Sequence, residues 1–270
     1  MAHVIITGGS SGIGAAIAEA CALRGDSVSL IARRTEALER FASALETHCV
    51  RDGARIVAAT ADVSQPGSVT EAVALCERQN GPCDLLVTSA GVVKPGRFDV
   101  QAPETFEAQL ATNLFGTINA VRAVYPGMVA RRQGRVLMLG SGAGLIGVYG
   151  YTAYCASKYA VAGFAEALRA EARTFGVTIS ICYPPDTETP QLAGELPDRP
   201  AEATATIGAG GRLSANAVAR AALAGVERGR FAIYPGAQMK MLGLFGSVAM
   251  PLLRPIFDRR IDRVRKTSGQ

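Results

Sequence analysis

The sequence has no tryptophan and only two histidines, and charged residues make up only 19% of its 270 residues. Its six cysteines form no C-x-x-C pair, and with so few histidines a zinc site is not expected. We therefore predict no metal, and reduced thiols in a cytoplasmic protein. No basic segment with an apolar core precedes the first strand-like run, so no signal peptide is predicted.

The net charge of +5 is concentrated near the C-terminus. Six basic and two acidic residues between positions 254 and 266 give a local charge of +4, and the rest of the chain is close to neutral. A nearly neutral body argues against a nucleic-acid partner. Because 49% of the residues are apolar, most of the chain is expected to fold, and its length suits one large domain.

Strand-like and helical segments alternate along the chain. β-branched runs predict strands at 3–7, 27–32, 54–60, 84–88, 134–140 and 177–183, and helices are expected near 12–24, 35–50, 66–79, 103–132 and 152–175. The alternation predicts an α/β fold with a parallel sheet covered by helices on both faces. Ligands of such sheets bind outside the carboxyl ends of the strands, so motifs that follow the strands should gather at one edge.

A glycine-rich turn joins the first strand-like run to an alanine-rich helical segment. In the stretch from Gly8 to Gly14, Gly8 can form the tight turn, Gly12 lets the backbone approach a pyrophosphate, and Gly14 allows close helix packing. The spacing G-x-x-x-G-x-G differs from the usual dinucleotide fingerprint, and no P-loop lysine follows. A plain tight turn is the alternative, but the strand–turn–helix context favours a nucleotide site.

Tyr154 and Lys158 are four residues apart and would share one face of a helix. Ser141 lies thirteen residues before Tyr154. An ammonium beside a phenol favours the phenolate, so we expect Lys158 to lower the pKa of Tyr154. Tyr154 could then exchange a proton with a carbonyl or alcohol oxygen, to which Ser141 could donate a hydrogen bond. Taken alone, the pair is also a common accident on helices. Cys155 beside it is interpreted as a small packing residue rather than a nucleophile.

Together these motifs resemble the short-chain dehydrogenase/reductase family, over about residues 3–235. The match includes Thr7-Gly8, Gly12-Ile13-Gly14, Asp62-Val63, Ala90-Gly91, Asn113, Ser141, Tyr154 and Lys158, in order and at similar spacing. The resemblance implies a Rossmann-type doubly wound sheet, a nicotinamide cofactor, hydride transfer at a carbonyl carbon, and a dimer or tetramer. Where the wider family often has Asn-Asn-Ala-Gly, this chain has Thr88-Ser89-Ala90-Gly91, which weakens the inference of an asparagine contact near the adenosine.

By position, Asn113, Ser141, Tyr154 and Lys158 match the family's catalytic tetrad. The cofactor contacts that the resemblance and the motifs imply are Gly8, Ser10, Ser11, Gly12, Ile13, Gly14, Arg33, Arg34, Asp62, Val63, Ala90, Gly91, Tyr154, Lys158, Pro184, Thr187 and Thr189.

A narrower resemblance lies in the segment from Tyr183 to Pro190 and in the segment from Gly147 to Tyr154, which are similar to 3-ketodihydrosphingosine (3-ketosphinganine) reductases. Pro185 stands where most family members have glycine. This likeness implies reduction of a lipid-like long-chain 3-ketone in sphingolipid synthesis. The alternatives are a reductase of another ketone, such as a 3-oxoacyl thioester or a steroid, and a non-catalytic NADPH-binding sensor.

The end of the second strand-like run distinguishes between cofactors. An acidic residue there would bind the ribose hydroxyls and favour NAD, but this chain has Ala32 followed by Arg33 and Arg34. Guanidinium groups suit a 2′-phosphate, so we predict NADPH as the cofactor. A solvated basic turn is the alternative, although cations are unfavourable near a helix N-terminus.

Two further residues have two interpretations each. Asp62 either caps the following turn or contacts adenine, and both can hold. Asn113 falls inside a predicted helix, where asparagine is unfavourable. It is either a surface amide or, as the resemblance implies, part of a local helix distortion that holds a water linking Lys158 to solvent.

The C-terminal third is expected to contain a loop and an extension. Residues 184–212 carry five prolines and are expected to form a long loop that closes over cofactor and substrate. We divide the chain into a catalytic domain, 1–236, and an apolar then basic extension, 237–270. Its apolar segment, 241–253, is shorter than the ~20 residues of a membrane-spanning helix. It either lies at the inner face of a membrane or packs in an interface or against the substrate pocket.

Overall fold

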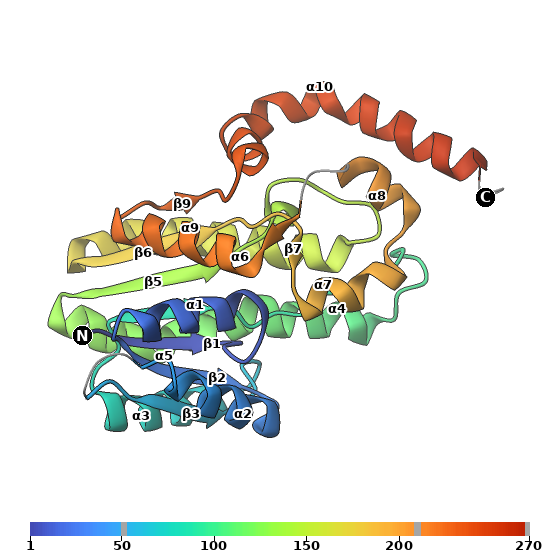
Figure 1. Ribbon diagram of the computed structural model, residues 1–270. Helices are drawn as coiled ribbons and strands as arrows, with labels where there is room; N and C mark the ends of the chain where they lie inside the picture. The colour runs from blue at the N-terminus through green and yellow to red at the C-terminus, as the bar shows by residue number, and fades with distance from the viewer. Residues whose placement is uncertain (50–52, 208–211, 268–270) are drawn as a thin grey trace.

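The computed structural model describes residues 1–49, 53–207 and 212–267. Seven strands form one parallel sheet in the order β3-β2-β1-β4-β5-β6-β9 (Figure 1). The bounds are β1 His3–Thr7, β2 Ser27–Ala32, β3 Ile56–Thr60, β4 Leu85–Thr88, β5 Gly134–Leu139, β6 Val177–Cys182 and β9 Ala232–Ile233. The doubly wound sheet predicted from the alternation is confirmed, and the six expected strands match to within two residues. Only β9 was not expected, because two residues carry no recognisable pattern.

Three helices cover each face of the sheet. The side chains of α1 (Gly12–Leu23), α2 (Thr35–Glu46) and α9 (Ala215–Glu227) pack on one face, and those of α3 (Pro66–Asn80), α5 (Gly116–Arg131) and α6 (Thr152–Ala172) pack on the other. The strands between them are almost fully buried, as expected for a parallel sheet covered on both sides. The end of the helix predicted at 35–50 falls in part on residue 50, outside the described residues.

The helix predicted at 103–132 is interrupted. It divides into α4 (Pro103–Leu110), the π-helix η1 (Ala111–Phe115) and α5. π-turns inside helices widen the backbone by one residue and frequently mark functional sites. The interruption contains Asn113, in agreement with the distortion that the family resemblance implies.

The segment expected as a long loop, 184–212, is largely structured in its described part. It contains β7 (Thr187–Glu188), α7 (Pro190–Glu195), η4 (Leu196–Asp198) and α8 (Ala201–Ile207), and residues 208–211 lie outside the described residues. The Thr189 hydroxyl caps α7 by accepting a hydrogen bond from the Leu192 N–H at 3.2 Å, and Pro190 occupies the first turn. Threonine followed by proline is typical of the start of a helix. The prediction of a loop rested on the number of prolines and did not take this pattern into account. β7 pairs with β8 (Leu213–Ser214) in a separate small sheet.

The C-terminal extension forms one helix, α10 (Ala237–Thr267), which crosses the top of Figure 1 over α8. The 13-residue apolar segment is thus part of a 31-residue helix that is long and apolar enough, by length and composition, to cross a membrane. The expectation that no spanning helix exists therefore does not hold by those two criteria. Only 6% of the most apolar stretch of α10 is buried, so it is no core helix. Residues 268–270 of the expected extension lie outside the described part.

Candidate active site

One pocket opens at the carboxyl ends of the central strands, as the strand order requires. The turn after β1 forms its floor. Gly8 has a positive φ of 66°, and a Cβ there would lie 2.6 Å from the backbone nitrogen of Ala90, so only glycine fits. A Cβ on Gly14 would collide with the carbonyl oxygen of Gly8. The first N–H groups of α1 have no intrahelical partner, so they are available to bind an anion in this pocket.

Ser141, Tyr154 and Lys158 line this pocket together with the glycine turn. Ser141 follows β5, and the other two residues lie on the first turns of α6. The Ser141 hydroxyl lies close enough to the Tyr154 phenol to lower the pKa of that phenol, and it accepts a hydrogen bond from the Ala143 N–H at 3.1 Å. The Lys158 ammonium donates to the Leu139 carbonyl at 2.9 Å and lies 5.7 Å from the centre of the Tyr154 ring. The predicted serine, tyrosine and lysine therefore converge.

The expected lowering of the tyrosine pKa is wrong in this structure. Burial raises the pKa of Tyr154 to about 12; the Ser141 hydrogen bond opposes this rise, and the charges of Glu195 and Asp186 add to it. Burial also lowers the pKa of Lys158 to about 8, and its ammonium is directed to the Leu139 carbonyl. Tyr154 therefore holds its proton at neutral pH, the state that a proton donor needs.

Asn113 is 1% exposed, which excludes the surface-amide interpretation. Its side-chain oxygen accepts from the Val92 N–H at 2.8 Å, and its NH₂ donates to the Val92 carbonyl at 2.9 Å and to the Ser157 hydroxyl at 3.0 Å. It does not line the pocket. Instead it ties the strand-end loop at Gly91 to α6 beside Lys158, from behind the pocket wall.

Most of the predicted cofactor residues line the same pocket, and a smaller group lies outside it. The lining members are Gly8, Ser11, Gly12, Ile13, Ala90, Gly91, Tyr154, Lys158, Pro184, Thr187 and Thr189. The members outside its lining are Ser10, Gly14, Arg33, Arg34, Asp62 and Val63.

Arg33 and Asp62 follow neighbouring strands, β2 and β3, and form an ion pair at 3.9 Å between exposed side chains. Asp62 also accepts the Ser64 N–H and hydroxyl at 2.9 and 2.8 Å, which confirms the turn-capping interpretation. Burial raises the pKa of Asp62, but these hydrogen bonds and the Arg33 charge outweigh it and lower the pKa below its usual value. Arg34 is exposed at the start of α2.

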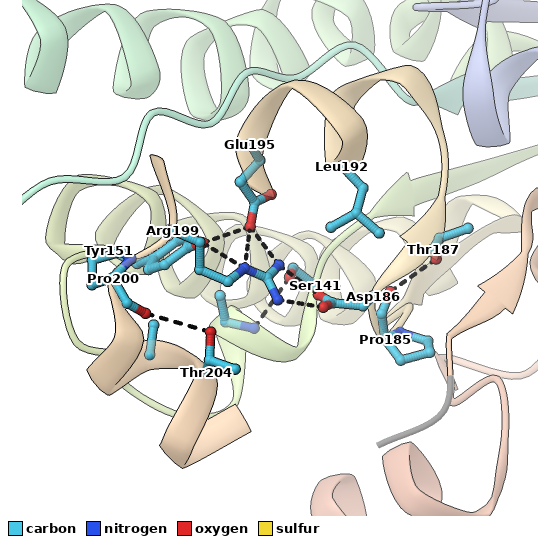
Figure 2. A network of polar contacts seen from close by, with 12 residues as sticks. Ser141, Tyr151, Pro185, Asp186, Thr187, Leu192, Glu195, Arg199, Pro200 and Thr204 are labelled. Carbon is cyan, nitrogen blue, oxygen red and sulfur yellow. Dashed lines mark hydrogen bonds and ion pairs between the residues drawn. The ribbon is translucent and has the colours of Figure 1, made fainter. Parts of the chain in front are cut away.

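A polar network that lines the same pocket was missed by sequence reasoning (Figure 2). The Arg199 guanidinium binds both oxygens of Asp186, at 2.6 and 3.1 Å, and one oxygen of Glu195, at 2.6 Å. The Tyr151 hydroxyl donates to that same Glu195 oxygen at 2.5 Å. No local motif indicates this network, because Tyr151 precedes α6 whereas Asp186, Glu195 and Arg199 lie at separate places after β6, and the four side chains meet only in the fold. The Glu195–Arg199 spacing of four residues was the one available signal.

The remaining pocket wall is mainly apolar. Leu192 of α7, Ile207 of α8, and Met239 and Leu242 of α10 contribute to it, with Gln238 beside them. α10 therefore completes the pocket that the sheet begins. No cluster of three or more potential metal-binding side chains occurs in the described ranges 1–49, 53–207 and 212–267.

A doubly wound parallel sheet with a glycine turn and a Ser–Tyr–Lys set in one pocket defines a class of nucleotide-dependent oxidoreductases. The chain belongs to the short-chain dehydrogenase family, whose sequence pattern matches residues 2–200. It is 40% identical over 202 residues to the 3-ketodihydrosphingosine reductase of Bos taurus, covering 74% of this chain. The match spans only 61% of that relative's length.

Solved structures share the fold closely. A short-chain dehydrogenase from Sphingobium yanoikuyae in complex with NADPH superposes with a TM-score of 0.78 at 26% identity, over 94% of this chain and 96% of that one. A short-chain dehydrogenase/reductase from Burkholderia phymatum in complex with NAD gives a TM-score of 0.80 at 25% identity, over 93% and 94%. The fold is therefore shared by proteins that bind either nicotinamide cofactor.

Proposed function

We propose that the protein reduces a long-chain 3-ketone, 3-ketodihydrosphingosine, to dihydrosphingosine with NADPH. The observation that carries the proposal is the convergence of Ser141, Tyr154 and Lys158 on the pocket floored by the glycine turn. The likeness to a 3-ketodihydrosphingosine reductase supports the choice of ketone. The division into a catalytic domain, 1–236, and an extension, 237–270, stays a prediction, and α10 begins at its boundary.

Each side chain has a role that follows from its position. Bound NADPH would supply the hydride. Ser141 and Tyr154 hold the ketone oxygen between them, and Tyr154 donates its proton to that oxygen as it becomes an alcohol. Lys158, cationic below about pH 8, holds the ribose. Asn113 acts from behind, since its amide fixes Ser157 and the loop at Val92 and so maintains the proton relay beside Lys158.

The residues present fit a nicotinamide dinucleotide. The pyrophosphate would lie on the N–H groups of Gly12 and Ile13 at the start of α1, and both residues line the pocket. Pro184, Thr187 and Thr189 border the nicotinamide end of the pocket. Asp62 and Val63 follow β3 on the adenine side.

Arg33 and Arg34 support NADPH over NADH. The Arg33 side chain is 56% exposed, and among the described residues its one ion pair, to Asp62, is long at 3.9 Å, so its guanidinium is available to bind a 2′-phosphate. We expect Arg33→Ala and Arg34→Ala each to raise the KM for NADPH about tenfold, the size of one charge-assisted hydrogen bond. Both variants should leave the KM for NADH unchanged.

The matched control for these variants is Arg40→Ala. Arg40 is 75% exposed on α2, the helix that follows Arg34, and among the described residues its ion pair is with Glu36, at 3.9 Å. Equal KM values for NADPH and NADH in the unchanged protein would contradict the choice of cofactor.

The apolar wall favours a lipid-like ketone. Leu192, Ile207, Met239 and Leu242 line the pocket and give it an apolar surface, where an alkyl chain can be removed from water. NADPH oxidation should be measured with 3-ketodihydrosphingosine beside 3-oxoacyl thioesters of matched chain length. If the thioester is reduced faster than 3-ketodihydrosphingosine, a 3-oxoacyl thioester is the better assignment of the substrate. An absence of oxidation with any ketone, a steroid included, would favour a sensor.

We propose in addition that α10 contacts a membrane at its inner face from the cytoplasm. Large apolar side chains on α10 are exposed at helical spacing, and a basic segment follows them. The exposed set is Met241, Leu244, Phe245, Val248, Leu252 and Ile256. Because Met239 and Leu242 on the same helix line the pocket, membrane contact would bring the pocket mouth close to lipid.

Full-length protein should co-sediment with vesicles that contain anionic lipid, and Leu244→Glu and Val248→Glu should abolish this. Val100→Glu is the control, since Val100 is 73% exposed on the body of the protein. Point variants are preferable to removal of α10, which would open the pocket.

A dimer or tetramer is expected from the family resemblance. The oligomeric state of both α10 variants should be measured by light scattering. If the variants are smaller oligomers than the unchanged protein, and the unchanged protein binds no vesicles, this face is an interface between copies of the chain.

A further inference from the structure

The polar network of Asp186, Glu195 and Arg199, which lines the pocket, carries more negative than positive charge. Asp186 and Glu195 contribute two carboxylates, and Arg199 contributes one guanidinium. The Arg199 side chain is only 8% exposed and that of Glu195 only 10%, so solvent screens this imbalance weakly. Lys158, the other cation that lines the pocket, is held by the Leu139 carbonyl.

Among the described residues, the hydrogen bonds to the Glu195 carboxylate all go to one of its two oxygens. Tyr151 and Arg199 donate to its Oε1, at 2.5, 2.6 and 3.2 Å. Within the described part of the chain, its Oε2 accepts no hydrogen bond, and Figure 2 shows that oxygen directed away from the guanidinium. A carboxylate oxygen in a pocket without a donor is a site for a ligand N–H.

Glu195 lies close to the phenol at which we propose that the ketone reacts. Tyr151 donates to Glu195, and its ring packs edge-on against that of Tyr154 with 6.3 Å between ring centres. The charge of Glu195 also raises the pKa of Tyr154, so carboxylate and phenol lie within electrostatic range of each other. Ser141 lines the same pocket.

We propose that Glu195 is a specificity-determining residue, which binds the protonated amine of a 2-amino-3-ketone through Oε2 and so selects cationic amino ketones over neutral ketones. The inference rests on the proposed function and names its substrate class. In 3-ketodihydrosphingosine, the carbon beside the ketone carries an ammonium group, whereas 3-oxoacyl thioesters and steroids carry no such charge. The ammonium would restore neutrality to the network of Asp186, Glu195 and Arg199.

The network also explains how Glu195 is held for this task. Tyr151 and Arg199 fix its Oε1, and Arg199 is itself fixed by both oxygens of Asp186. A carboxylate that is already oriented loses little conformational entropy when it binds a ligand. Tyr151, Asp186 and Arg199 are thus positioning residues, which act on the substrate through Glu195.

The test compares 3-ketodihydrosphingosine with its des-amino analogue, a 1-hydroxy-3-ketone of the same chain length. Glu195→Gln keeps the oxygen that accepts from Tyr151 and Arg199 but removes the charge. We expect kcat/KM for the amino ketone to fall about ten- to a hundredfold, the size of a charge-assisted hydrogen bond, with the des-amino ketone changed less than twofold. Glu188→Gln is the matched control, because Glu188 is exposed on the same segment and does not line the pocket.

A second measurement stands apart from turnover. Binding of dihydrosphingosine and of its des-amino diol to NADP-loaded protein should show a ten- to hundredfold loss for the amine alone in Glu195→Gln. This result would hold even if no ketone were reduced, so the failure of the proposed reaction and the failure of the inference can be told apart. Equal losses for amine and des-amino ligands, or no loss for either, would overturn the assignment of Glu195.

Discussion

The two walls of the pocket are built in different ways. The wall with Ser141, Tyr154 and Lys158 is formed by strand ends and by α6, a long helix that packs on the sheet, so its side chains are held by the core of the domain. The wall with Asp186, Glu195 and Arg199 is formed by short segments after β6, and ion pairs join these three side chains. Under the proposed function, the reaction takes place at the wall that the core of the domain holds. The substrate is selected at the wall that contains the polar network.

The largest effect is expected on the chemical wall. Tyr154→Phe removes the proton donor but keeps the ring, so kcat should fall about 10²- to 10⁴-fold, the usual contribution of a general acid. NADPH binding, measured by fluorescence titration, should stay within about twofold, because the phenylalanine ring fills the same space. A near-normal kcat in this variant would show that Tyr154 is not the proton donor, and the two walls could then not be distinguished by their roles.

The next effect concerns the stability of the other wall. Arg199→Met leaves two mostly buried carboxylates without their cation, which should destabilise the fold by about 3 kcal/mol. Urea denaturation measures this loss. Arg97→Met serves as the control, because Arg97 forms its ion pair with Asp99 on the surface, and it should leave the urea midpoint unchanged. Equal midpoints for both variants would show that the network does not hold this wall.

A pH profile isolates Lys158 on the chemical wall. The pKa of Lys158 is lowered to about 8, so its cation is present below pH 8 and is lost as the pH rises through that value. Tyr154, with its pKa near 12, stays protonated over the same range. With a neutral ketone as substrate, kcat/KM should therefore fall about tenfold per pH unit above pH 8. Lys158→Met should lower the activity throughout and abolish this descent; a flat profile in the unchanged protein would contradict the role of the lysine.

The smallest effect is expected at the start of α7. Thr189→Ala removes the hydroxyl that caps this helix, which should cost about 1 kcal/mol of stability. Thermal unfolding measures the loss, and Thr189→Ser, which retains the hydroxyl, should restore most of it. If alanine and serine behave alike, the helix does not depend on its cap.

Much of the fold could be predicted because its signals are local. Apolar β-branched runs separated by amphipathic helices indicated six of the seven sheet strands, and β9 was missed because two residues show no period. The region 184–212 was expected as a loop because of its prolines, yet Pro190 begins a helix that Thr189 caps. Prolines start helices as readily as they end them, so their number alone does not predict a loop.

The site divides along the same line. The spacing of Tyr154 and Lys158 predicted two neighbours on one helix, but the direction of the tyrosine pKa shift depends on burial and on carboxylates far away in the sequence. Asn113 was recognised as unusual in a helix, whereas its partners Val92 and Ser157 are visible only in the folded chain.

What the residues determined by themselves is the chemistry available: a glycine turn before a helix, a phenol, a hydroxyl, an ammonium and two guanidinium groups at a strand end. Only the tertiary structure decided that Glu195, Arg199 and Asp186 face the reacting phenol, and that the first turn of α10 completes their pocket. The physical reason is range. Helix and strand patterns arise from neighbours in the chain, but the desolvation and Coulomb interactions that set a site's charge arise from whatever the fold brings within a few ångströms.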